Sequence, residues 1–174
     1  MKRFKFKKTG FTLIEMTIYV AILGFIVLSL LSFFIWANRA RVKTSVVNEV
    51  INNANRAMSV MVYEIKNADE IYFPTSTTTQ LSLKTINYLP SGEQISYIDF
   101  YLCGAQICMK KEALPAVALI SDEVIVTNLS FTQVATSSVP SVYIDLTLDS
   151  SDGGDRIDYN FSYNITSNAS VRSY

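Results

Sequence analysis

The sequence predicts an α+β fold in which a long N-terminal α-helix packs on a C-terminal antiparallel β-sheet. Three observations support this prediction. They are an uncharged apolar run, an amphipathic helical pattern directly after it, and apolar residues that alternate with polar ones from residue 80 onward. The chain has 174 residues, the length of one small domain plus an anchor rather than of several domains.

The helix is predicted to begin in an apolar stretch from Gly10 to Trp36. Residues 16–35 carry no charge, and about 20 apolar residues can cross the roughly 30 Å hydrocarbon core of a bilayer. A secretory signal has a shorter apolar region of about 7–15 residues and a small-residue cleavage site, and no Ala-x-Ala follows here. The stretch therefore predicts a membrane anchor. An anchor alone does not explain Glu15, because a charge within a membrane helix costs about 2.5–3.5 kcal/mol and usually has a function.

Residues Gly10-Phe11-Thr12-Leu13-Ile14-Glu15 follow a basic leader with five Lys or Arg residues. Together they resemble the class III signal of type IV prepilins and type II secretion pseudopilins. The resemblance covers about residues 1–36. It implies that prepilin peptidase cuts between Gly10 and Phe11, that Phe11 becomes N-methylated, and that Glu15 pairs with a neighbour's N-terminal amine during assembly. It also implies other pilins or pseudopilins and an inner-membrane assembly platform as partners.

Three further residues of the apolar stretch bear on this resemblance. Ala21 and Gly24 lie where small residues are common in these helices. Ser32 departs from the pattern, because many major pilins have a helix-kinking proline at this place.

The physical setting of Glu15 is consistent with a role between subunits. In a helix that starts at Phe11, Glu15 lies in the first turn, where the helix dipole favours an anion. A buried carboxylate needs a partner, yet no Lys, Arg or His occurs from Phe11 to Ala37. Cleavage would supply an α-amine, and the amine of a neighbour shifted along a filament would satisfy the carboxylate better than the subunit's own. We interpret Glu15 as the residue that sets the register between subunits.

The distribution of charge predicts the orientation of the chain. The positive-inside rule places the basic leader in the cytoplasm, so we expect a single-pass anchor among the lipids of the inner (cytoplasmic) membrane and a periplasmic or extracellular C-terminal domain. Loss of the leader removes five of the fifteen cations and none of the fifteen acids, which leaves about −5. Only the cluster Arg39-Arg41-Lys43 remains basic, which argues against binding of nucleic acid by this chain itself.

The helix is predicted to continue past the membrane to Asp69. No Pro or Gly interrupts the chain from Phe25 to Phe73, and a helix from Phe11 to Asp69 would be about 88 Å long. An independent coiled-coil stalk is disfavoured because the heptad is short and imperfect. The predicted apolar face contains Val42, Val46, Val50, Ala54, Ala57, Met61, Ile65 and Ala68, and the predicted polar face contains Lys43, Asn48, Asn52, Asn55, Ser59, Glu64 and Lys66.

Pro74 and the following Thr-rich run end the helix, and alternation with period two predicts strands beyond them. Turn residues occur at Pro90-Ser91-Gly92 and at Asp152-Gly153-Gly154-Asp155. We expect the sheet to pack on the helix face that carries Val50, Met61 and Ile65. The predicted strands are Gln80–Leu89, Gln94–Cys103, Ile107–Lys111, Glu123–Val134, Val142–Leu148 and Arg156–Ile165. The predicted organisation is a cytoplasmic leader (1–10), a transmembrane half-helix (11–36), an amphipathic half-helix (37–69) and an extracytoplasmic β-rich domain (70–174).

The order of these elements resembles the minor pseudopilin J and PilW-type minor pilin group. The features that carry this resemblance are the long helix with Arg56 and Glu64-Ile65, the strand-like segments Leu81-Ser82-Leu83 and Ile95-Ser96-Tyr97, and Val126–Phe131 before a terminal hairpin. Other minor pilins, including competence-type ones, remain open.

The two cysteines, Cys103 and Cys108, flank a short loop. A structural disulfide is favoured over two buried free thiols and would stabilise the fold by roughly 2 kcal/mol in the chain-entropy model. Zinc is disfavoured, because the chain has no His and no second ligand pair.

The acidic turn with Asp149, Asp152 and Asp155 is a weak calcium candidate, because a solvated hairpin favours the same residues. We expect no resident metal or cofactor.

No catalytic constellation appears in the sequence, and we expect a protein that is not an enzyme. Two functions remain. The first is a minor pilin or minor pseudopilin, a structural subunit of a type IV pilus or a type II secretion-type filament. The second is a signal-anchored extracytoplasmic binding protein that does not polymerise.

Overall fold

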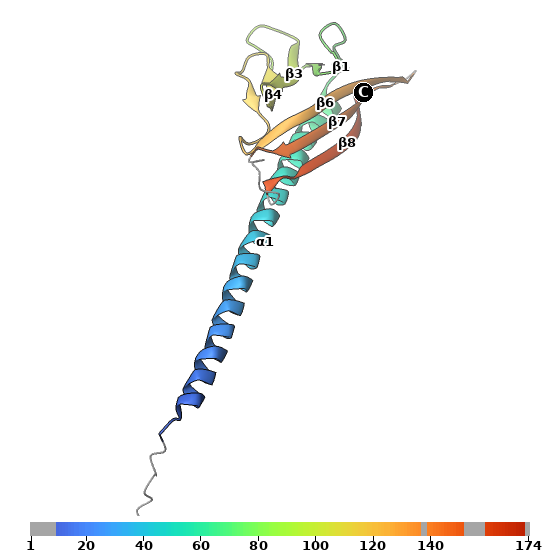
Figure 1. Ribbon diagram of the computed structural model, residues 1–174. Coiled ribbons are helices and arrows are strands. Elements are labelled where there is room, and N and C mark those ends of the chain that lie inside the picture. Colours follow the sequence, from blue (N-terminus) through green and yellow to red (C-terminus); the bar gives the residue numbers. More distant parts are fainter. Residues whose placement is uncertain (1–9, 137–138, 152–158, 173–174) are drawn as a thin grey trace, which may run out of the picture. The chain divides into compact units, whose positions relative to one another are not determined.

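The structure, a computed structural model, describes residues 10–136, 139–151 and 159–172. Its internal contacts divide the chain into two units, Met1–Arg41 (unit 1) and Val42–Tyr174 (unit 2). One α-helix, α1 (Leu13–Asn67), continues through the boundary between them (Figure 1). The predicted long helix is thus confirmed, although it begins two residues later and ends two residues earlier than expected.

Within unit 1, α1 carries no charge from Met16 to Trp36, and apolar residues lie on all its sides there. It is long and apolar enough to cross a membrane, and its membrane-length apolar segment is not buried within the chain. Phe25, for example, is 76% exposed and Trp36 is 67% exposed. The segment from Leu13 to Trp36 rises about 36 Å, which exceeds a hydrocarbon core of about 30 Å. This segment therefore suits a membrane anchor.

The part of α1 in unit 2 presents a buried face, as its periodicity predicts. Val42 and Val46 are only half-buried. The prediction is wrong for Glu64, which is expected on the polar face but is only 6% exposed. Its charge is tolerated there because Lys111 of the first sheet forms an ion pair with it. The predicted apolar residues that are buried are Val50, Ala54, Ala57, Met61, Ile65 and Ala68.

Unit 2 contains two antiparallel sheets where the sequence predicts one. The first sheet has the strand order β1-β2-β3-β4-β5. Two of its strands, β1 and β5, are two residues long and were not predicted, because so short a strand has no detectable period. The bounds are β1 (Glu70–Ile71), β2 (Gln80–Thr85), β3 (Ser96–Cys103), β4 (Gln106–Lys111) and β5 (Val117–Ala118).

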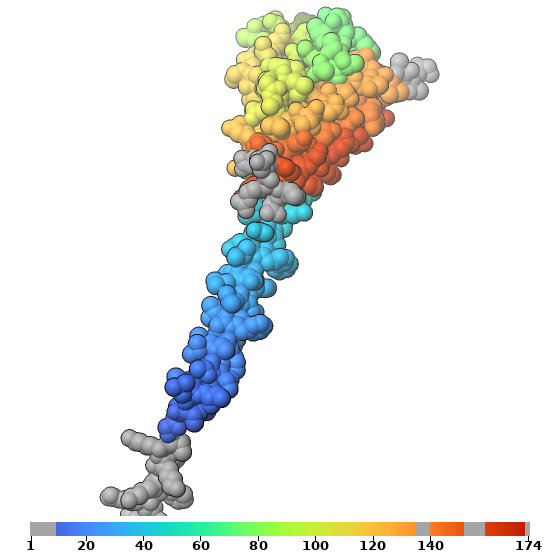
Figure 2. Space-filling view, in the orientation of Figure 1, coloured from blue at the N-terminus to red at the C-terminus, as the bar shows by residue number. Residues whose placement is uncertain are grey.

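The second sheet has the order β6-β7-β8, with β6 (Val124–Thr136), β7 (Val139–Ser150) and β8 (Ser162–Ser170). Of the strand predicted at Arg156–Ile165, residues 156–158 lie outside the described residues and residues 159–161 are not strand. β8 begins at Ser162, because pairing with β7 starts at Asp149↔Ser162 and ends at Ser141↔Ser170. Its predicted alternation is correct where the strand exists, since Tyr163 and Ile165 pack against the core. Figure 2 shows β6 to β8, orange to red, side by side on the viewed face of unit 2.

The two sheets and the second part of α1 share one hydrophobic core. Val50, Met61 and Ile65 of α1 belong to it, which confirms the predicted packing face. Phe100 of β3 and Leu146 of β7 are fully buried in the same cluster.

One predicted turn lies between β2 and β3. The Glu93 N–H donates to the Pro90 carbonyl at 3.1 Å, and Gly92 has a φ of 94°. A positive φ at the third residue of a four-residue turn is the conformation for which glycine is preferred. The second predicted turn, Asp152–Asp155, lies outside the described residues.

Candidate functional site

The first turn of α1 is capped by Thr12. The Glu15 N–H donates to the Thr12 carbonyl at 3.1 Å and to the Thr12 hydroxyl oxygen at 3.3 Å. The Met16 N–H donates to the same carbonyl at 3.2 Å. Thr-x-x-Glu is the sequence pattern of a capping box, and the structure shows the half of it in which the cap side chain accepts. The cap therefore fixes the position at which the helix begins.

Gly10 and Phe11 precede this cap and are not helical. Gly10 is exposed, and Phe11 is 69% exposed. A Cβ added to Gly10 would meet no atom within 4 Å, so this fold does not itself require a glycine there. The Gly10–Phe11 bond thus lies in non-helical, accessible chain, which is the state in which a protease can bind a backbone.

Glu15 lies three residues after the cap and is half-buried. The Tyr19 hydroxyl donates to Glu15 Oε1 at 3.4 Å, a long hydrogen bond. The Phe11 and Tyr19 rings meet edge to face with centroids 6.1 Å apart. In the part of the chain that the structure describes, no cation lies within ion-pair distance of Glu15. Its carboxylate therefore retains free acceptor capacity.

Sequence reasoning missed the structural roles of Thr12 and Tyr19. The signal for Thr12 was available, because Thr-x-x-Glu before an apolar run marks a helix N-terminus. The signal for Tyr19 was weaker, since four-residue spacing places two side chains on the same helix face without saying that they bond.

Further along unit 1, Ser32 replaces the proline of many major pilins. Its hydroxyl donates to the Leu28 carbonyl at 3.0 Å, a bond within the helix that serine can form and proline cannot. At Gly24 an added Cβ would meet no atom within 4 Å, so its small size serves no contact inside this chain. No contact of Ala21 bears on its proposed role.

Cys103 and Cys108 lie at disulfide-bonding distance, with their Cα atoms 5.8 Å apart. The loop between them is tighter than the sequence predicts. β3 and β4 are joined by Gly104 and Ala105 alone, and Cys103 pairs with Gln106. Gly104 has a φ of 70°, a left-handed conformation that glycine adopts without strain.

The acidic calcium candidate falls mostly outside the described residues. Asp152 and Asp155 lie outside the described residues, and Asp149 is the second-last residue of β7. Asp149 Oδ1 is buried and has no partner in the described part of the chain. Among the described residues, no group of three or more His, Cys, Asp or Glu side chains could hold a metal ion.

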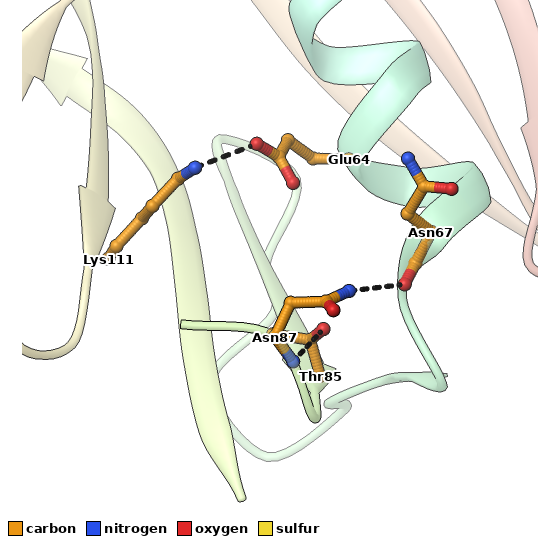
Figure 3. A network of polar contacts seen from close by, with 5 residues as sticks. All are labelled: Glu64, Asn67, Thr85, Asn87 and Lys111. Carbon is orange, nitrogen blue, oxygen red and sulfur yellow. Dashed lines mark hydrogen bonds and ion pairs between the residues drawn. The ribbon is translucent and has the colours of Figure 1, made fainter. Parts of the chain in front are cut away.

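A polar network inside unit 2 joins α1 to the first sheet (Figure 3). Glu64 Oε1 lies 3.0 Å from Lys111 Nζ, and these side chains are 7% and 14% exposed. Lys111 Nζ also lies 3.4 Å from the centroid of the Tyr88 ring. Burial by itself lowers the pKa of Lys111, but hydrogen bonds to Glu64 and Tyr88 outweigh it and raise the pKa above its usual value of 10.5. Nearby, the Asn87 side-chain amide donates to the Asn67 carbonyl at 3.5 Å.

A second network joins α1 to the segment before β6. Arg56 donates to the Leu119 carbonyl from Nε at 3.0 Å and from its terminal nitrogen at 2.7 Å. The Asn53 amide oxygen accepts the Ser121 N–H at 2.9 Å. Arg56 and Glu64 therefore both form contacts between α1 and the rest of unit 2.

The segment at the start of α1 is similar to a known family motif. Residues 5–31 match the family model of the prokaryotic N-terminal methylation motif. The chain carries a prepilin-type signal. This is the signal of type IV pilins and pseudopilins, and it supports a pilin-like substrate of prepilin peptidase. Proteins with this motif are structural rather than catalytic. No curated protein and no solved structure matches the chain.

The prepilin-type signal and the fold agree. The structure has one long N-terminal helix packed in unit 2 on antiparallel sheets, which is a pilin-like α+β arrangement. The signal and the apolar first half of α1 together indicate a membrane-anchored pilin-like protein with prepilin peptidase as a partner.

Proposed function

We propose that this chain is a minor pilin or minor pseudopilin, a non-catalytic subunit of a type IV pilus or a type II secretion-type filament. Prepilin peptidase cuts between Gly10 and Phe11, and Phe11 becomes N-methylated. The chain then leaves the inner membrane to join other pilins or pseudopilins through the assembly platform, with its C-terminal domain in the periplasm or outside the cell. The order of elements favours the minor pseudopilin J and PilW-type group within this class.

The observation that carries this proposal is the methylation motif at residues 5–31. The geometry of Glu15 supports it. A carboxylate held in the first helical turn, with one long hydrogen bond from Tyr19 and no cation among the described residues beside it, has room for a donor from another subunit. The α-amine freed at a neighbour's Phe11 is such a donor. A charge-assisted hydrogen bond of this kind is about twice as strong as a neutral one.

Mass spectrometry of the membrane-bound chain tests the proposal. The expected product begins at N-methyl-Phe11 and lacks the leader. Gly10→Val is a matched control, because a Cβ at Gly10 meets nothing in the fold. This variant should keep its leader while its C-terminal domain remains folded. An intact Met1 in cells that contain the peptidase, or a cut elsewhere, would instead favour the signal-anchored binding protein.

A further inference from the structure

A pocket of about 380 Å³ lies on the outer face of the first sheet in unit 2. Asp99 of β3 and Lys110 of β4 are cross-strand partners that line it. Ile98 and Phe100, on either side of Asp99 in β3, point the opposite way and are buried in the core. The pocket is therefore separate from the core of unit 2 and from the segment at the start of α1.

Two tyrosines form one wall of the pocket. The rings of Tyr72 and Tyr97 meet edge to face, with centroids 5.0 Å apart. Backbone hydrogen bonds hold both residues, because the Tyr72 N–H donates to the Ser82 carbonyl at 2.8 Å and the Glu112 N–H donates to the Tyr97 carbonyl at 3.0 Å. Tyrosine combines an apolar ring with a hydroxyl that donates and accepts. The two tyrosines therefore offer both kinds of contact from backbone positions that the sheet fixes.

Two carboxylates in the pocket are also held in place. Asp99 Oδ1 accepts the Ser82 hydroxyl at 2.5 Å, and Ser82 is 1% exposed. Glu112 Oε2 accepts the Tyr97 N–H at 3.1 Å. Each carboxylate has two oxygens with about four acceptor sites in total, so each retains capacity for a ligand.

The donors in the pocket are uncommitted. In the described part of the chain, neither the Gln80 amide nor the Lys110 ammonium has a hydrogen-bond or ion-pair partner. The pocket therefore has acceptors held by hydrogen bonds beside donors that are available to a ligand. The loss of Gln80 and Lys110 would break no contact that the fold uses.

We propose that this pocket binds a neutral saccharide. Sugar hydroxyls donate and accept at once, which matches acceptors at Asp99 and Glu112 facing donors at Gln80 and Lys110. The C–H faces of a sugar ring are apolar and suit tyrosine rings. Two carboxylates against one ammonium disfavour an anion, and the described residues of the pocket supply too few ligands for a metal ion. The volume lies at the lower end of the range of about 300–1,000 Å³ for small-molecule sites, which suits a short oligosaccharide.

This site goes beyond a structural role, and it does not depend on whether the chain polymerises. Its test uses the full-length chain in lauryldimethylamine oxide micelles, because a detergent with a sugar headgroup would compete. Chitotriose, cellotriose and maltotriose are titrated separately and followed by saturation-transfer NMR. At least one should bind with a Kd of about 1 mM or tighter. If none binds with a Kd of about 1 mM or tighter, the proposal is wrong.

The double variant Gln80→Ala/Lys110→Ala locates the site. It should weaken binding at least about tenfold, because two polar contacts are lost, while the unfolding curve stays unchanged. Lys66→Ala is the matched control, since it removes the same charge from an exposed position on α1 and should bind as the unaltered chain does. Equal binding by the double variant would overturn the assignment of the saccharide to this pocket.

Discussion

The two parts of α1 obey the same helical geometry but find their partners in different places. In unit 1 apolar side chains surround the helix, and its membrane-length apolar segment is not buried within the chain. In unit 2 one face is buried under two sheets and the other is exposed. An apolar pattern on all sides indicates a partner outside the chain, such as lipid or other subunits, whereas an amphipathic pattern indicates a partner within it.

The two acids at the ends of α1 sharpen this comparison. Glu64 in unit 2 is buried and has its cation, Lys111, within the same chain. Glu15 in unit 1 has a hydroxyl but no described cation beside it. We therefore expect substitutions in the second part of α1 to change the stability of unit 2, and substitution of Glu15 to change association.

The largest effect is expected where the buried pair is broken. Glu64→Gln leaves Lys111 buried without its counter-ion, and removing one partner of a buried pair typically destabilises by about 3–5 kcal/mol. Urea unfolding of the full chain in micelles, followed by the near-ultraviolet circular dichroism of its tyrosines, should show this loss. The double variant Glu64→Met/Lys111→Met should recover most of it, because it leaves no unpaired charge. A double variant as unstable as Glu64→Gln would show that packing rather than charge is responsible.

Truncation of the buried helix face should have an effect nearly as large. Met61 is fully buried, and Met61→Ala should lower the free energy of unfolding of unit 2 by about 2–5 kcal/mol. The matched variant Leu28→Ala removes a side chain that is 66% exposed in unit 1 and should leave the unfolding of unit 2 unchanged. A comparable loss for both variants would contradict the division of α1 into two parts with separate partners.

The ion pair also predicts a dependence on pH. The pKa of Lys111 is raised in the folded state, so its contribution is fully present below the unfolded value of 10.5 and is lost as pH rises through the folded value. The unfolding free energy of the unaltered chain should therefore fall above about pH 10.5 more steeply than that of Lys111→Met. Parallel curves would mean that Lys111 contributes no linkage.

A smaller effect is expected at the β3–β4 turn. The pair Cys103 and Cys108 closes a short loop, and a disulfide there should contribute about 2 kcal/mol in the chain-entropy model. Cys103→Ser/Cys108→Ser should lose about that amount in urea unfolding, and a reductant should have the same effect on the unaltered chain only. Insensitivity of the unaltered chain to reductant would indicate free thiols.

The sequence predicted some features of this structure correctly and others wrongly, and the difference has a physical reason. Periodicity identified the buried face of α1, because burial of apolar residues repeats with the helical turn. It misplaced Glu64, because whether a charge is buried depends on a partner 47 residues away, Lys111, and no local pattern contains that information. The start of β8 was wrong for a similar reason. Alternation includes residues 159–161, which are not strand, because pairing with β7 begins only at Ser162.

The division into two sheets was also out of reach of the sequence, because alternation shows that a strand has a buried face and not which strand lies beside it. The processing segment was the opposite case. Its residues are close in sequence, so the motif from the leader to Glu15 could be recognised locally. Even so, the Thr12 cap was overlooked, although its capping-box spacing was visible.

The smallest effect on stability, and the largest on association, is expected for Glu15. Glu15→Gln keeps the shape of the side chain and its acceptor for the Tyr19 hydroxyl but removes the charge. In the described part of the chain Glu15 forms no ion pair that the variant could lose. The unfolding of unit 2 should therefore not change.

Incorporation of the Glu15→Gln chain into sheared filaments, measured by immunoblot against the membrane-bound pool, should fall strongly, because the neighbour's α-amine would enter the apolar segment without a counter-ion. Processing at Phe11, read by mass spectrometry, should be checked in the same sample. Full incorporation of a processed Glu15→Gln chain would show that the carboxylate does not set the register between subunits, and the acid would then need an explanation within unit 1.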